Sequence, residues 1–158
     1  GILEALTEIS KRFPIIFPIH PRTMKQVREF GFQEFFSNLT NAGNDFYHNG
    51  IHCIEPQGYL DFLRLVSCAR LVLTDSGGIQ EETTVLGVPC VTLRESTERP
   101  VTVTLGTNII TGTKRDAIIK GAQDHLATDP SSMQGRVPPL WDGKAAERIV
   151  SILADQKG

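Results

Sequence analysis

Residues 71–82 have the sequence Leu71-Val-Leu-Thr-Asp-Ser-Gly-Gly-Ile-Gln-Glu-Glu82, and this stretch is the strongest indication of the fold class. Its apolar start, residues 71–74, predicts a buried strand, and a helix is expected from Gly78 to Leu86, ended by Gly87. The two glycines between them let the backbone turn sharply and approach a ligand closely. The stretch therefore predicts a strand, a tight turn and a helix in immediate succession.

This turn is a candidate anion site. The first N–H groups of a helix have no partners within it, and they point where the positive end of the helix dipole lies. Ser76 can add its hydroxyl, so a diphosphate is the expected ligand. Glu82 lies about one turn further along, where a carboxylate suits a neutral diol such as a ribose. The structural alternative is a tight turn with Ser76 as the helix N-cap.

Apolar strands and amphipathic helices alternate on both sides of this unit. Further strands are expected at residues 14–19, 51–54, 88–93 and 108–111. Helices are expected at 2–12, from a Thr23 cap to Gly31, at 59–69, from a Thr113 cap to Ala127, and at 144–154, with a loop at 37–49 and a linker at 128–142. The pattern predicts one α/β domain over residues 1–158, a Rossmann-like doubly wound parallel sheet with helices on both faces.

In such a sheet the ligand lies at the carboxyl ends of the strands, so the residues that follow each strand are the next candidates. Arg94 and Arg99 follow residues 88–93, and each could donate a forked pair of hydrogen bonds to a phosphate. Pro100 suits the first turn of a helix and would place Arg99 at its start. The alternative is a solvated loop with Arg–Glu ion pairs.

Two other strand ends carry weaker candidates. His20 follows the strand at 14–19 and could contact a ligand, although a lone histidine is more often structural. After the strand at 51–54, Gln57 could hydrogen-bond a base edge or hold a loop. Phe62, on the helix that follows, could stack on a base or pack in the core.

Composition excludes several classes of function. The net charge of −2 in 158 residues gives no basic excess, so nucleic acid is not an expected partner. No apolar run approaches the ~18 residues of a membrane span, and no signal peptide is expected at the start. The three cysteines, Cys53, Cys68 and Cys90, lie in apolar segments, which predicts buried free thiols, a reducing cytoplasm and no metal site.

Two hydrolase motifs can be set aside. Asp-Ser-Gly-Gly also surrounds the nucleophile of trypsin-like proteases, but those proteins are all-β, whereas Ser76 lies between a strand and a helix. The Gly-x-Ser-x-Gly elbow of α/β-hydrolases is not matched, because Thr74 stands in place of the first glycine. Ser76 is therefore not expected to be a nucleophile.

Five stretches together resemble the non-hydrolysing UDP-N-acetylglucosamine 2-epimerases. They are Pro18-Ile-His-Pro21, Glu55-Pro-Gln-Gly-Tyr-Leu60, Leu73-Thr-Asp-Ser-Gly-Gly-Ile-Gln-Glu-Glu82, Leu86-Gly-Val-Pro89 and Thr97-Glu-Arg-Pro100. The resemblance implies the carboxy-terminal half of a GT-B-like two-domain enzyme of cell-surface polysaccharide biosynthesis, which inverts C2 of the sugar by eliminating and re-adding UDP. It assigns the diphosphate to Ser76, Gly77 and Gly78, the ribose to Glu82, and the uracil to Gln57 and Phe62. It also implies that Arg99 contacts the phosphates and stabilises departing UDP, that His20 contacts a regulatory nucleotide, and that no cofactor or metal takes part.

The chain departs from this family in its extent. The family's acid and base residues belong to an amino-terminal domain that is absent, and a strand ending in a His-Arg-Arg-Glu type motif normally precedes this point, in the middle of the sheet. We therefore expect a piece of a longer, homodimeric protein, inactive by itself. A GT-B glycosyltransferase domain, a non-catalytic nucleotide-sugar-binding module and a hydrolysing epimerase remain alternatives.

Overall fold

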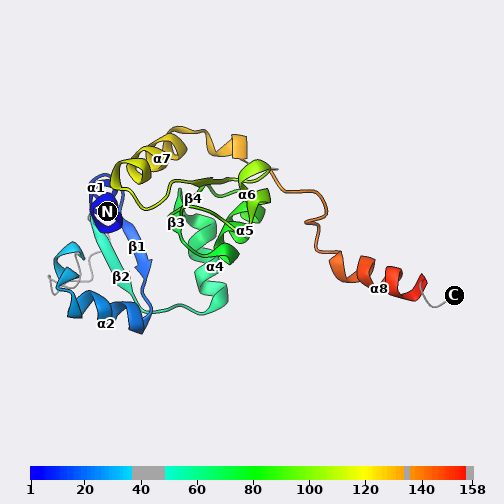
Figure 1. Cartoon of the computed structure of the whole chain (residues 1–158), viewed down its shortest axis with the longest axis horizontal. Helices are drawn as coiled ribbons and strands as arrows, with labels where there is room; N and C mark the ends of the chain where they lie inside the picture. Colours follow the sequence, from blue (N-terminus) through cyan, green and yellow to red (C-terminus); the bar gives the residue numbers. More distant parts are fainter. Residues whose placement is uncertain (37–48, 134–135, 156–158) are drawn as a thin grey trace.

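The computed structural model describes residues 1–36, 49–133 and 136–155. Strands and helices alternate along the chain, with short 3-10 helices between some of them (Figure 1). In chain order the elements are α1 (Ile2–Ser10), β1 (Ile15–Pro18), α2 (Pro21–Glu29), η1 (Phe32–Phe35), β2 (Ile51–Ile54), α4 (Tyr59–Cys68), β3 (Val72–Thr74), α5 (Gly77–Leu86), β4 (Cys90–Thr92), α6 (Pro100–Thr104), β5 (Asn108–Ile110), α7 (Arg115–Ala127), η2 (Pro130–Met133) and α8 (Ala145–Asp155). The expected α/β alternation is confirmed; the loop expected at 37–49 lies almost entirely outside the described residues.

All five described strands are in parallel pairs, but they form two sheets rather than one. β1 pairs with β2, and the second sheet has the order β3-β4-β5. Within the described residues no strand joins β1 to β3.

Two apolar clusters hold the layers together. One lies around β1 and β2 and includes Phe36, whose ring stacks on Phe17 at a centroid distance of 6.1 Å. The other lies between α1 and α7, and Ile15 of β1 and Leu73 of β3 both pack against it. Figure 1 shows α7 on one side of the β3–β5 sheet and α4 and α5 on the other. The α1–α7 layer therefore joins the two sheets.

The start of α2 differs from the expectation. Its N-cap is His20, not Thr23, and the Nδ1 atom of His20 accepts a hydrogen bond of 3.2 Å from the Arg22 amide. Pro21 occupies the first helical position, where its fixed φ suits a helix and its missing N–H costs nothing. The proline therefore starts the helix before Thr23 is reached.

Two further expectations are wrong. The N-cap of α7 is Lys114, without a side-chain cap, whereas the amide of Thr113 donates to a carboxylate oxygen of Glu95. Cys53 and Cys90 are buried, but Cys68 is exposed, because it lies on the outer face of the last turn of α4. Apolar neighbours in sequence did not predict on which side of the helix the thiol lies.

Helix α8 stands apart from the rest of the chain at the right of Figure 1. Four of its apolar side chains are more than half exposed: Ile149, Val150, Ile152 and Leu153. Among the described residues, no helix has both the length and the apolar character to span a bilayer.

Candidate functional site

The turn between β3 and α5 presents unused hydrogen-bond donors. Ser76 is the N-cap by position, but its side chain makes no capping hydrogen bond, and its amide donates to Thr74 Oγ1 at 3.0 Å. Gly77 and Gly78 form the first two positions of the ten-residue helix. Because the serine hydroxyl does not cap the helix, it is available together with the first helical amides to bind an anion. The purely structural role of Ser76 is not supported.

The backbone conformation of the turn does not explain why Gly77 and Gly78 are glycines. Neither has a positive φ, so the backbone conformation does not require glycine. A Cβ at Gly77 would meet Arg99 Cγ at 3.8 Å, and one at Gly78 would come no closer than 4.0 Å, to Ser76 Oγ. Both distances are ordinary contacts, so only the second expected reason remains, the close approach of a ligand.

Arg99 lies beside this turn. It is the N-cap of α6, with Pro100 at the first helical position, as the sequence predicts. Its Nε pairs with Glu81 Oε1 at 2.8 Å, and its Nη1 donates to the Glu98 carbonyl. Arg99 and Glu81 are each about two-fifths exposed, so the guanidinium lies at the surface and can reach a bound anion. The turn and this cation together make up one candidate anion site.

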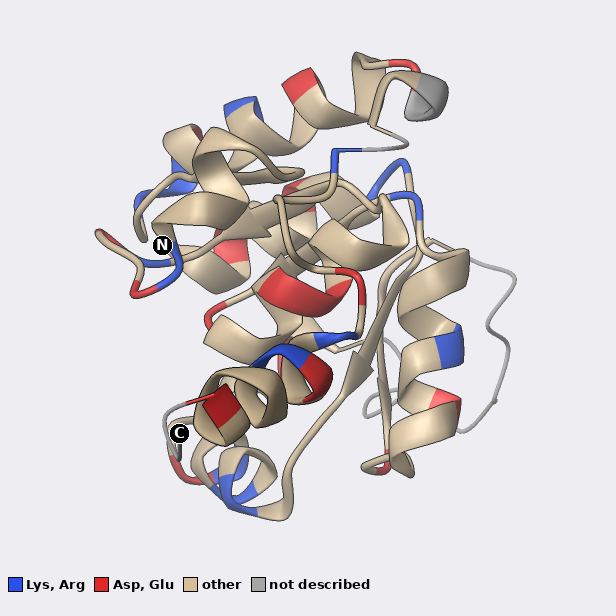
Figure 2. Cartoon of the chain, turned by 90° about the vertical axis from the view of Figure 1, so that its right-hand side faces the viewer, with Lys and Arg blue, Asp and Glu red and all other residues tan. Residues whose placement is uncertain are grey.

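Arg94 forms an Arg–Glu ion pair in the solvated loop, which was the alternative to phosphate binding. Its two terminal nitrogens donate to both oxygens of Glu98, at 3.1 and 3.0 Å. A backbone hydrogen bond within Glu98, and then Arg94, hold the pKa of the Glu98 carboxyl below its usual value. Figure 2 shows basic and acidic segments interspersed over the face of the molecule that it presents. Arg94 is therefore engaged in an exposed ion pair, and we do not assign it to the anion site.

A buried polar network lies beneath the Arg99 loop. Gln80 is completely buried, and its Oε1 accepts hydrogen bonds from Thr97 Oγ1 at 2.6 Å and from Asn108 Nδ2 at 3.2 Å. Asn108 also contacts the hydroxyls of Thr92 and Thr102. Sequence analysis missed this network. A signal was present, since the face of α5 that packs inward carries glutamine and threonines where aliphatic residues are usual.

Glu82 lies in a pocket between α4 and α5. The pocket has a volume of about 410 Å³. Its lining is mostly apolar with two carboxylates, and consists of Tyr59, Leu63, Glu81, Glu82, Val85, Leu86 and Trp141. Glu82 therefore lies about one turn along α5 from the β3–α5 turn, in a partly apolar setting. Trp141 was not among the predicted residues, because it comes from a distant part of the chain.

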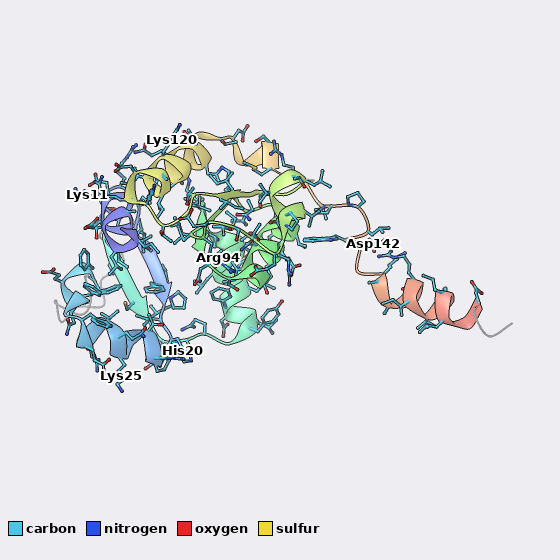
Figure 3. All side chains as sticks on the ribbon, in the orientation of Figure 1. Lys11, His20, Lys25, Arg94, Lys120 and Asp142 are labelled. Carbon is cyan, nitrogen blue, oxygen red and sulfur yellow. The ribbon has the colours of Figure 1, made fainter. Side chains whose placement is uncertain are left out.

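The remaining candidates lie outside this arrangement. Gln57 is exposed and donates to the carbonyl of Glu55 at 2.7 Å, and Phe62 is half-buried on α4; neither lines the pocket. His20 is exposed at the start of α2, beside the other sheet, and Figure 3 shows it well away from Arg94. Within residues 1–36, 49–133 and 136–155, no group of three or more metal-binding side chains comes together.

Comparisons with known proteins identify the family of this chain. The model of the UDP-N-acetylglucosamine 2-epimerase family matches residues 1–154. A UDP-N-acetylglucosamine 2-epimerase of Methanocaldococcus jannaschii is 44% identical over 97% of this chain, and a UDP-2,3-diacetamido-2,3-dideoxy-D-glucuronate 2-epimerase of Pseudomonas aeruginosa is 35% identical over 98%. This chain spans 39% of the length of each.

A solved structure extends the comparison to three dimensions. The M. jannaschii UDP-GlcNAc 2-epimerase in complex with UDP-GlcNAc and UDP matches with a TM-score of 0.76 and 43% identity, over 97% of this chain and 39% of that one. Because the family model covers nearly the whole chain, and the fold and the strand–turn–helix unit agree with it, the chain belongs to the UDP-N-acetylglucosamine 2-epimerase family.

Proposed function

We propose that this chain is the nucleotide-binding half of a UDP-sugar 2-epimerase that interconverts UDP-N-acetylglucosamine and UDP-N-acetylmannosamine. The observation that carries the proposal is the pairing of the uncapped start of α5 with Arg99 beside it. Helical amides and a guanidinium together suit a diphosphate, which carries more charge than either would neutralise alone. The M. jannaschii relative crystallised with UDP and UDP-GlcNAc supports the choice of nucleotide.

The residues take the following roles in this proposal. Ser76, Gly77 and Gly78 bind the diphosphate, and Glu82 accepts hydrogen bonds from the ribose hydroxyls at the edge of its pocket. Arg99 binds the phosphates. It also stabilises the negative charge that develops on UDP as UDP leaves the anomeric carbon of the sugar, which is bonded to C2. Electrostatic stabilisation of the leaving group is the catalytic role that we assign to Arg99.

Gln57 and Phe62 have a less direct case. Gln57 lies between β2 and α4, and Phe62 lies in the first part of α4. We propose that the two side chains flank the uracil. The Gln57 amide is exposed and donates to the Glu55 carbonyl, and a turn of this side chain would direct it toward a base edge. His20 stays proposed as the contact to a regulatory nucleotide, supported by its exposed ring beside the other sheet.

We also propose that the chain works within a longer, dimeric protein. It spans 39% of the M. jannaschii relative, which leaves room for an amino-terminal domain with the acid and base residues. A strand from the segment preceding Gly1 would fill the break between β1 and β3 and join the two sheets. Three free cysteines support a reducing compartment, and we place the protein in the cytoplasm.

The sugar has a second candidate. The P. aeruginosa relative is named for a diacetamido-glucuronate substrate, so an oxidised, diacetamido UDP-sugar is the alternative to UDP-N-acetylglucosamine. The residues assigned above bind the nucleotide, which the two sugars share. A product assay on the full-length protein with each sugar distinguishes them, and release of free N-acetylmannosamine would instead identify a hydrolysing enzyme.

Isothermal titration of the chain with UDP tests the nucleotide site. We expect Arg99→Ala to weaken UDP binding by about 10- to 100-fold, because a hydrogen bond to a charged group contributes about 1.5–3 kcal/mol. Glu82→Ala should weaken it as well, whereas Glu147→Ala, an exposed carboxylate on α8, should not. Binding that both site variants leave unchanged would contradict the proposed site.

A further inference from the structure

Thr97 makes two hydrogen bonds with one hydroxyl. It donates to Gln80 Oε1 at 2.6 Å and accepts from the Arg99 amide at 2.9 Å. A hydroxyl has one proton to donate, so these two bonds fix its orientation. Through Thr97, the backbone of Arg99 is joined to the second turn of α5, the helix whose first turn is the proposed diphosphate site.

The anchor at the other end of this connection is rigid. Gln80 is completely buried, and its Oε1 also accepts from Asn108, which is 2% exposed. Asn108 in turn contacts Thr92 of β4 and Thr102 of α6. These hydrogen bonds hold Gln80 Oε1 inside the core, so the acceptor that Thr97 meets is positioned by the buried network and not by the exposed loop.

A different residue of α5 orients the side chain of Arg99. Glu81, next to Gln80, pairs with the Nε of the guanidinium at 2.8 Å. The Nε edge is therefore turned toward the helix, while the terminal nitrogens are directed elsewhere, one of them donating to the Glu98 carbonyl at 3.3 Å. With the backbone and the Nε both held, the guanidinium has little freedom relative to Gly77, whose Cβ position lies 3.8 Å from Arg99 Cγ.

From these contacts we infer that Thr97 is a positioning residue, which places Arg99 against the diphosphate of the bound nucleotide. The inference rests on the proposed function, in which Arg99 binds the phosphates. Thr97 itself touches no substrate; it acts by fixing the start of α6 relative to the start of α5. Removing its hydroxyl takes the acceptor away from the Arg99 amide and leaves the Gln80 oxygen with one partner fewer.

The test compares UDP with uridine, which lacks the phosphates. Thr97→Val keeps the shape of the side chain without a donor or acceptor, and Thr97→Ser keeps the hydroxyl. We expect Thr97→Val to weaken UDP binding by about tenfold and to leave uridine binding unchanged within about twofold, whereas Thr97→Ser binds both as the unaltered chain does. In Arg99→Ala, adding Thr97→Val should cause no further loss, because the residue it positions is gone.

Controls separate this role from a general effect on folding. Thr128→Val removes a threonine hydroxyl, partly buried at the end of α7, that donates to the Asp124 carbonyl, and should change neither titration. Thermal unfolding checks that each variant is folded, and Thr97→Ala replaces the valine variant if that one is not. These measurements use the complete 158-residue chain.

The outcomes distinguish failure of the positioning role of Thr97 from failure of the phosphate-binding role of Arg99. If Arg99→Ala weakens UDP but Thr97→Val does not, or if Thr97→Val weakens UDP and uridine equally, the positioning role is refuted and the proposed function stands. If Arg99→Ala has no effect on UDP binding, the phosphate role of Arg99 fails and the positioning role fails with it.

Discussion

Replacing Gly78 by alanine should separate the needs of the fold from those of the ligand. The residue is the second of α5 and has no positive φ, and the nearest heavy atom to an added Cβ is Ser76 Oγ at 4.0 Å. The folded backbone therefore accepts alanine without strain. A Gly→Ala change at a compatible position stabilises a protein by about 0.4–1 kcal/mol, chiefly by restricting the unfolded chain. We expect Gly78→Ala to unfold at a slightly higher temperature.

The same methyl group should weaken UDP binding. It lies among the first helical amides, where the diphosphate is proposed to approach the backbone, so at least one N–H···phosphate bond has to lengthen or break. Loss of one charge-assisted hydrogen bond costs about 1.5–3 kcal/mol, which corresponds to about 10- to 100-fold in Kd. The assay is isothermal titration with UDP, with uridine as the ligand that should not be affected.

Two results would refute this reasoning. Unchanged UDP affinity in a folded Gly78→Ala chain would mean that no phosphate lies against the turn. A clear loss of stability would mean that the turn needs a conformation that only glycine adopts, contrary to the geometry described. The combination expected here, a gain in stability with a loss of affinity, is produced by neither alternative.

Three more predictions concern other parts of the fold. Gly121→Ala in α7 should destabilise the protein in urea unfolding, because the new Cβ would lie 2.6 Å from Thr111 Cγ2, and overpacking costs about 1–3 kcal/mol against a helix-propensity gain of about 1 kcal/mol. Thr111→Ser removes that methyl group and should recover part of the loss; no recovery would place the strain elsewhere. Iodoacetamide at pH 8 should alkylate exposed Cys68 and spare Cys90, whose pKa burial raises to about 11, and mass spectrometry showing equal labelling would contradict this. Burial lowers the pKa of His125, so the unfolded chain binds more protons than the folded one, and the free energy of unfolding should fall as pH drops through about 6.5. His125→Gln should reduce this dependence of the free energy of unfolding on pH. A stability of the unaltered chain that does not change with pH in this range would contradict the prediction.

Local sequence signals predicted most of the elements. The apolar runs located all five described strands to within two residues at either end, and the Gly87 stop and the Arg99–Pro100 start are where the structure has them. These signals work because burial and backbone geometry at such points depend on a few neighbouring residues.

What the sequence did not predict depends on contacts between distant segments. The ion pair of Arg99 with Glu81 and the hydrogen bond of Thr97 with Gln80 join residues that are far apart in the sequence, by 17 positions in the case of Thr97 and Gln80. No local sequence pattern specifies such a partner. The split of the strands into two sheets is of the same kind, since each strand by itself has the composition of a buried parallel strand. The exposure of Cys68 depends on the rotation of α4 against α5.

The packing of α1 against α7 has a consequence for synthesis on the ribosome. These helices are near the two ends of the folded body, and Ala5 and Ile9 of α1 are buried with Ile118 and Ala122 of α7. The part of α1 that carries Ala5 and Ile9 therefore lacks these partners until α7 has been translated. At about 5–20 residues per second, the intervening stretch of roughly 100 residues takes about 5–20 s. During that interval the nascent chain exposes an aggregation-prone surface, so the time that a chaperone must cover is set by the speed of translation between these two helices.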